Sequence, residues 1–164
     1  MGIQLPEELT GLLSMIGYDF PESDEESIFN LAGAWTGMAD QISGKVESLN
    51  TAAKTLLENN VGAEIDAFAS EWGDAESAVR NIADAADPTN IINIGLTIAA
   101  GVVLALKLQV IAQLVILAFQ IAQAIATAAV TFGASLVQIP IFKTITGIIV
   151  DQLIGMAIEM VLNG

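Results

Sequence analysis

Two series of regularly spaced apolar residues, joined by a short turn, constrain the fold of this chain more than any other feature of its sequence. In the first series the steps are 3, 4, 3, 4, 4, 3, 4 and 3 residues, and in the second they alternate between 3 and 4 throughout. Such steps place apolar side chains on one face of an α-helix. The first series is Ile28, Leu31, Trp35, Met38, Ile42, Val46, Leu49, Ala53 and Leu56, and the second is Ile65, Phe68, Trp72, Ala75, Val79, Ile82 and Ala86.

The turn between the two series predicts how the helices are arranged. The sequence Asn59–Gly62 interrupts the apolar pattern and contains residues that tolerate the left-handed conformation. We therefore predict an antiparallel hairpin whose first helix spans residues 24–58. A capping box of Ser23 and Glu26 begins this helix, and Pro88, which cannot continue a helix, ends the hairpin.

Composition changes abruptly after the hairpin. Residues 1–90 carry 17 acidic and 3 basic side chains, whereas residues 91–164 carry two of each and are mostly Ile, Leu, Val, Ala and Gly. The acidic part repels nucleic acid, so we expect no nucleic-acid partner. The apolar part predicts two more helices, over 91–131 and 141–161.

The predicted fold class is therefore all-α, with an antiparallel long-helix hairpin followed by two long apolar helices in a helical bundle. A short helix over Pro6–Ile16, closed by Gly17, precedes the hairpin. We expect one helical domain over 1–164, with these parts: a short helix and linker in 1–22, an acidic hairpin in 23–88 and an apolar region in 89–164.

The side chains most used in catalysis are missing from the sequence. The chain has no cysteine and no histidine, which removes thiolate chemistry, the usual general base and the commonest metal ligand. We therefore predict no enzymatic activity, no catalytic residue, no metal site and no cofactor.

The apolar region fits either a soluble core or a membrane span. Lys107 and Lys143 bracket 35 residues without a charge, and about 20 apolar residues suffice to cross a bilayer. Polar residues nevertheless recur at helical spacing, and such a stripe suits a water-facing edge, a pore lining or a seam between helices. The stripe consists of Gln109, Gln113, Gln120, Gln123, Thr127 and Thr131.

Two motifs stand out in the N-terminal half. Trp35-Thr36-Gly37 is a Trp-x-Gly tripeptide on the first predicted helix, and Phe68 and Trp72 lie on the second. We predict that Trp35, Gly37, Phe68 and Trp72 serve packing and interaction. Tyr18 and Glu22 match a loose Tyr-x-x-x-Asp/Glu pattern, a candidate signal, although Pro21 prevents a regular helix through it.

Taken in order, these motifs resemble the WXG-like N-terminal domain of large actinobacterial polymorphic toxins. The resemblance covers nearly the whole chain and is carried by Phe20-Pro21-Glu22-Ser23-Asp24-Glu25, Ala34-Trp35-Thr36-Gly37, Asn59-Asn60-Val61-Gly62, Ala67-Phe68, Glu71-Trp72 and Lys107-Leu108-Gln109-Val110-Ile111-Ala112-Gln113-Leu114.

The resemblance implies a non-enzymatic delivery module for type VII (ESX-type) secretion, secreted or at the cell surface. Its partners would be small helical-hairpin secretion proteins or the secretion machinery, in a hetero-complex or a homo-oligomer. One branch of the family is described as forming a membrane channel, which is the alternative function, and a purely structural homo-oligomer is the second alternative. The family's export signal follows the hairpin, whereas Tyr18 and Glu22 precede it.

Overall fold

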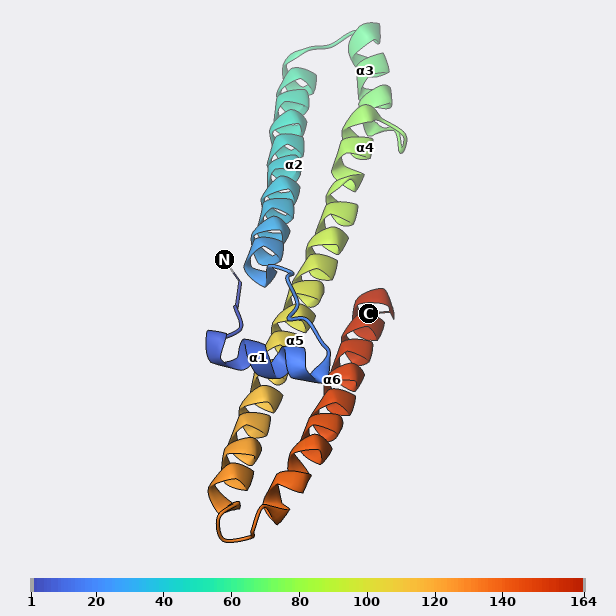
Figure 1. The fold of residues 1–164 in the computed structure, drawn as a ribbon. Coiled ribbons are helices and arrows are strands. Elements are labelled where there is room, and N and C mark those ends of the chain that lie inside the picture. Colours follow the sequence, from blue (N-terminus) through green and yellow to red (C-terminus); the bar gives the residue numbers. More distant parts are fainter. Residues whose placement is uncertain (1, 164) are drawn as a thin grey trace. The chain divides into compact units, whose positions relative to one another are not determined.

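The computed structural model describes residues 2–163, and every regular element in this range is a helix (Figure 1). This confirms the predicted all-α class, with a long-helix hairpin followed by two long apolar helices. The elements are α1 (Glu7–Ile16), α2 (Glu25–Asn59), α3 (Ala63–Gly73), α4 (Ala78–Asp84), α5 (Ala86–Thr127), the 3₁₀-helix η1 (Ala134–Val137) and α6 (Gln138–Asn163).

The first two helices follow the sequence signals closely. Helix α1 stops at Gly17, whose φ of 86° is the left-handed conformation expected at that position. Helix α2 is capped by Asp24, whose carboxylate accepts from the backbone N–H of Ser27 at 3.1 Å and from the Ser27 hydroxyl at 2.9 Å. The predicted cap, Ser23, was wrong by one residue because the first turn begins at Glu25.

The apolar spacing predicted one continuous helix for the second arm of the hairpin, but the arm is divided into two helices, α3 and α4. Helix α3 ends at Gly73, and the chain is extended at Asp74. The Asp74 carboxylate accepts from the backbone N–H of Glu76 at 2.8 Å, and α4 then begins at Ala78. A glycine followed by an aspartate that binds its own backbone is a sufficient physical reason for this break.

Two prolines lie at helix starts rather than at helix ends. Pro88 is in the first turn of α5, which begins at Ala86, so the prediction that it ends the hairpin was wrong. Pro140 is likewise in the first turn of α6. A proline is tolerated there because the N–H groups of a first turn have no partner within the helix. Helix α5 consequently starts five residues earlier than predicted and α6 three residues earlier.

The chain divides into two compact units. Unit 1 consists of Met1–Ile28 and Ile98–Gly164, and unit 2 of Phe29–Thr97.

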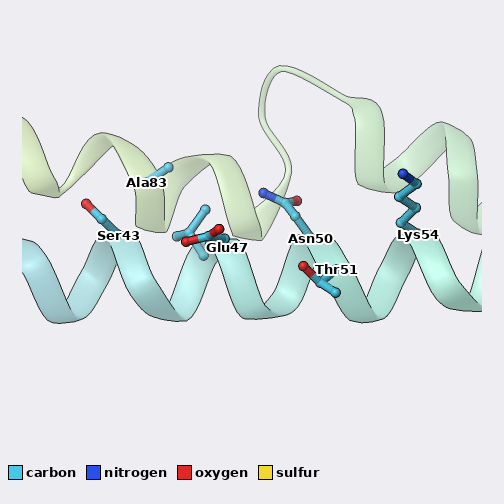
Figure 2. Close-up of a pocket in the computed structure, with 7 residues that line it drawn as sticks. Ser43, Glu47, Asn50, Thr51, Lys54 and Ala83 are labelled. Atoms are coloured by element: carbon cyan, nitrogen blue, oxygen red, sulfur yellow. The ribbon is translucent and has the colours of Figure 1, made fainter.

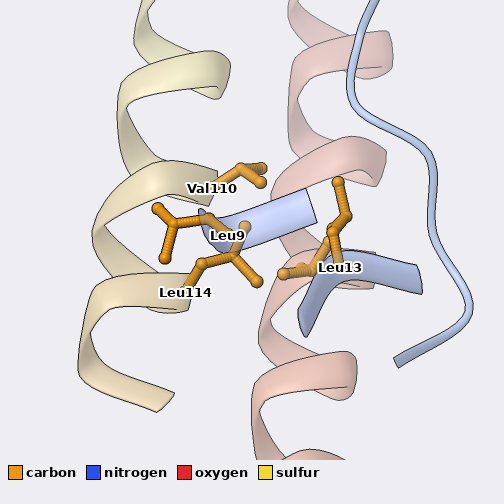
Figure 3. Close-up of a cluster of buried hydrophobic side chains, with 5 residues drawn as sticks. Leu9, Leu13, Val110 and Leu114 are labelled. Atoms are coloured by element: carbon orange, nitrogen blue, oxygen red, sulfur yellow. The ribbon is translucent and has the colours of Figure 1, made fainter. Parts of the chain in front are cut away.

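In unit 1, α1 packs on the apolar helices α5 and α6. Leu9 and Leu13 of α1 are buried against Val110 and Leu114 of α5 and Val150 of α6 (Figure 3). Leu114 is completely buried, and Leu13 is 3% exposed. This small aliphatic core explains why a ten-residue helix, too short to be stable alone in water, is held in place.

Unit 2 is the hairpin, in which α2 lies antiparallel to α3 and α4. Its buried apolar residues are small: Ala32, Ala39 and Ala53 on α2, with Val79 on α4. Alanine allows two helices to approach closely, but it buries little apolar area for each residue. The larger apolar residues of α2 are therefore not all inside the hairpin.

Candidate functional site

An exposed row of large apolar side chains on α2 is the main candidate for an interaction site. Its members are spaced 7, 11 and 7 residues apart, so at about 100° per residue they share one face along roughly 38 Å of helix. We call Leu31, Met38, Leu49 and Leu56 the α2 row; they are 50%, 50%, 42% and 41% exposed.

The α2 row is distinct from the buried alanines of the same helix, Ala32, Ala39 and Ala53, which we call the alanine line. Leu31 and Met38 each precede a buried alanine, Ala32 and Ala39, by one residue. One residue corresponds to a rotation of about 100° around a helix. The predicted seam was therefore only partly correct: the hairpin closes on its alanines and leaves the α2 row in solvent.

An aromatic pair on α3 is tied to α2 by a hydrogen bond. The rings of Phe68 and Trp72 lie 5.4 Å apart between centroids, at 35°. The indole Nε1–H of Trp72 donates to Asn50 Oδ1 of α2 at 3.0 Å. Both aromatic side chains are half-buried, so the pair joins the two arms and also presents a surface.

The other predicted interaction residues lie elsewhere on α2. Trp35 and Gly37 are both half-buried, and no atom outside the surrounding helix backbone lies within 4 Å of where a Cβ on Gly37 would be. Trp35 is 15 residues from Asn50, or about 22 Å along the helix. The structure thus brings Phe68 and Trp72 together but does not bring Trp35 to them.

A hollow of about 440 Å³ lies between the arms of unit 2 (Figure 2). Ala83 of α4 forms one wall and α2 forms the other, and the small Ala83 side chain leaves the space unfilled. Glu47 and Lys54 are its charged residues. The hollow is open to solvent. Its lining consists of Ser43, Val46, Glu47, Asn50, Thr51, Lys54 and Ala83.

The two residues of the predicted export pattern differ in their burial. Tyr18 is half-buried and packs against the core of unit 1, whereas Glu22 is exposed. Burial, together with the charge of Asp151 and a hydrogen bond to it, raises the pKa of the Tyr18 hydroxyl above its ordinary value. Tyr18 therefore has a packing role, and its role in export stays a prediction.

The polar stripe is divided among different places in unit 1. Its last four members line one hollow of about 340 Å³ near the turn between α5 and α6. Ser135 is buried beside them and donates its hydroxyl to the Ala124 carbonyl at 2.7 Å. Gln109 borders a separate hollow between α5 and α6, and Gln113 is half-buried. The four that gather are Gln120, Gln123, Thr127 and Thr131.

Sequence reasoning missed a buried ion pair in unit 1. Lys107 Nζ lies 2.8 Å from Glu25 Oε2, with the two side chains 1% and 6% exposed. Lys107 also donates to the carbonyl oxygens of Ile3, at 3.0 Å, and Ser23. The hydrogen bond from Lys107, together with the one from the Ile3 N–H, holds the pKa of the Glu25 carboxyl below its ordinary value. A lone lysine within an apolar helix was the available signal, because a buried charge needs a partner.

No metal-binding cluster is present in the part of the chain that the structure describes, residues 2–163: no three carboxylates there gather around a common point. Two helical stretches, Ala63–Thr127 and Ala134–Asn163, are long and apolar enough to cross a membrane, by length and composition alone.

Comparison with known proteins gave one match. A family model described as a WXG100-like domain matches residues 3–148, which include the whole hairpin and most of unit 1. Neither the curated proteins nor the solved structures gave a match. The match covers most of the chain, including its helical hairpin, and the chain therefore belongs to the family of WXG100-like domains.

Proposed function

We propose that this chain is a non-enzymatic delivery and interaction domain of a type VII secretion substrate or polymorphic toxin. The family relates the chain to helical proteins of type VII secretion. The observation that carries the proposal is the α2 row, four large apolar side chains between 41% and 50% exposed on one straight helix face. A surface of this kind is stabilised when a partner covers it.

The geometry of the α2 row favours a helical partner. Its 7-residue steps are those with which helices pack along a common seam. Unit 2 carries ten acidic and three basic residues, so a partner with basic residues beside its apolar face would gain electrostatic attraction. A small helical-hairpin protein of the same secretion system would satisfy both requirements if it carries basic residues beside its apolar face. A second copy of this chain would satisfy only the first.

Export from a host with a type VII system tests this function. The double variant Met38→Glu/Leu49→Glu places charges in the α2 row without touching the buried alanines, so we expect export and partner binding to fall at least tenfold. Ser48→Glu is the matched control, because Ser48 is exposed and lies about 100° around the helix from Leu49. Equal export of wild type and double variant would contradict the proposal.

Light scattering on the purified chain in detergent-free buffer separates the possible partners. A monomer that forms a complex only with an added hairpin protein supports hetero-pairing. A defined oligomer of the chain alone supports the structural homo-oligomer instead. Recovery only from the membrane fraction would favour the channel function.

A second candidate function is membrane insertion of the apolar helices as a channel. The observation that favours it is exposure: only 22% and 17% of the most apolar windows of the two candidate spans are buried. Core helices of soluble proteins are usually covered. Ion conductance across liposomes tests this function, and its absence across several lipid compositions and pH values would contradict it.

A further inference from the structure

Lys107 binds a single segment of the chain. Its ammonium group contacts Glu25 Oε2 and the carbonyl oxygens of Ile3 and Ser23, and it lies 5.7 Å from the centroid of the Phe20 ring. All four partners belong to residues 3–25, which we call the strap. The Ile3 N–H also donates to Glu25, so both ends of the strap meet at one lysine.

Lys107 is an isolated charge within an apolar helix. Between Pro88 and Phe142 it is the only charged side chain of the sequence. Burial of a charge in an apolar helix is costly unless it is paired and hydrogen-bonded. The strap supplies those partners, so Lys107 is satisfied only while the strap is in place.

The rest of the strap contacts unit 1 through apolar side chains, most of which are only partly buried. Helix α1 buries two leucines, Leu9 and Leu13, against α5 and α6, and five other strap residues pack around this core: Leu5, Leu12, Ile16, Tyr18 and Phe20. Residues 1–28 also contain seven acidic and no basic side chains, which favour solvation of a detached strap. Its detachment would leave the apolar surface around Val110, Leu114 and Val150 uncovered.

We propose that the strap is a detachable cover of the apolar helices and that the Lys107–Glu25 pair is its latch. While the latch is closed, the strap hides part of the apolar surface of α5 and α6. When it opens, that surface becomes available to a lipid bilayer. This last step rests on the second candidate function, whereas the opening itself does not.

Hydrogen–deuterium exchange tests the latch directly. Glu25→Gln keeps the shape of the side chain but removes its charge, so we expect exchange within residues 3–20 to accelerate by about tenfold or more. Amides of α6 should keep their protection. Glu8→Gln is the matched control, because Glu8 is an exposed carboxylate of the same strap. Unchanged strap exchange in Glu25→Gln, or equal loss of protection in α6, would overturn the latch.

An engineered disulfide tests the cover. The Cβ of Ile16 lies 4.0 Å from the position of a Cβ built on Gly147, a separation that suits a disulfide. The chain has no cysteine of its own, so Ile16→Cys/Gly147→Cys forms one defined bridge between the strap and α6. The probe is a vesicle of neutral phosphatidylcholine, which avoids repulsion by the acidic strap.

We expect the oxidised form to bind these vesicles at least tenfold less than the reduced form, and Glu25→Gln to bind more than wild type. Equal binding of the oxidised and reduced forms would overturn the cover. If no form binds vesicles, the membrane function fails, and the exchange comparison alone decides whether the strap opens.

Discussion

The two units use the same secondary structure but bury different residues. Unit 1 buries leucines and valines together with Ala100, Ala124 and Ala157, and it contains a buried ion pair. Many large apolar side chains of α5 and α6 are exposed as well. Unit 2 closes mainly on alanine and leaves Leu31, Met38, Leu49 and Leu56 half-exposed. The difference shows that bulky residues on a helix do not by themselves mark the inside of a hairpin. Where small residues line the contact, the large ones next to them remain available to a partner.

Charge separates the units as well. The acidic residues of unit 2 are distributed along its helices, whereas those of unit 1 are concentrated in residues 1–28, with only Asp151 and Glu159 beyond them. In unit 1 the buried ammonium group of Lys107 meets one of these carboxylates, that of Glu25. We therefore expect the removal of a charge to lower the stability of unit 1 mainly when it breaks the Lys107–Glu25 pair. In unit 2 the same kind of change should lower the stability only weakly.

The largest expected effect comes from breaking the buried pair. Lys107→Met leaves the Glu25 carboxylate buried without a counter-charge, so we expect a loss of about 3–5 kcal/mol in the stability of unit 1. Urea unfolding followed by hydrogen exchange in α6 measures it. The control in unit 2 is Lys54→Met: its pair with Glu58 spans 3.8 Å with side chains 75% and 62% exposed, and we expect less than about 0.5 kcal/mol. Similar losses would remove the electrostatic contrast between the units.

Acidic pH should weaken the same Lys107–Glu25 contact, with a smaller loss of stability than Lys107→Met. The pKa of Glu25 is lowered in the folded chain, so its stabilising contribution is complete above the ordinary glutamate pKa of about 4.3 and is lost as pH falls through the folded value. Asp24, whose pKa is lowered by its bonds to Ser27, acts in the same direction. Protection factors within the strap, which are corrected for the slower intrinsic exchange of amides in acid, should therefore fall at acidic pH in wild type. A similar loss of protection in Glu25→Gln would assign the effect to other carboxylates.

Much of the fold could be predicted from sequence because local signals determine helix ends. Gly17 and Gly62 have the positive φ values that their turns require, and the regular apolar steps identified the hairpin. The break at Gly73 was missed because apolar spacing continues across it. Spacing reports which face is apolar, but a side-chain hydrogen bond such as that of Asp74 interrupts a helix without changing the pattern.

The candidate sites were less predictable because they depend on distant contacts. Lys107 and Glu25 are 82 residues apart, and no local pattern links them. The α2 row and the alanine line are adjacent positions of one helix, so the sequence alone does not decide which one faces the second arm. Phe68 and Trp72 were found together because they are four residues apart on one helix face.

A change in the alanine core sharpens the contrast between the units. Ala39 is 3% exposed at the contact between the arms, so Ala39→Leu would force α2 away from the second arm. We expect a loss of about 1–3 kcal/mol in the stability of unit 2, measured by urea unfolding with the fluorescence of Trp35 and Trp72, which both lie in this unit. Met38→Leu, one residue away and exposed, should have almost no effect. If Ala39→Leu is tolerated as well, the alanine contact is loose and the α2 row is no more available than the alanine line.

The smallest expected effect concerns the hydrogen bond that joins α3 to α2. Trp72→Phe keeps an aromatic ring beside Phe68 but removes the indole N–H that donates to Asn50. Because this bond is exposed, we expect a loss of about 0.5–1 kcal/mol. The lost indole area adds to the measured value, so a double-mutant cycle with Asn50→Ala is needed to isolate the bond. Coupling near zero would mean that the arms of unit 2 are held by alanine packing alone, and the Phe68–Trp72 pair would then be free to serve a partner.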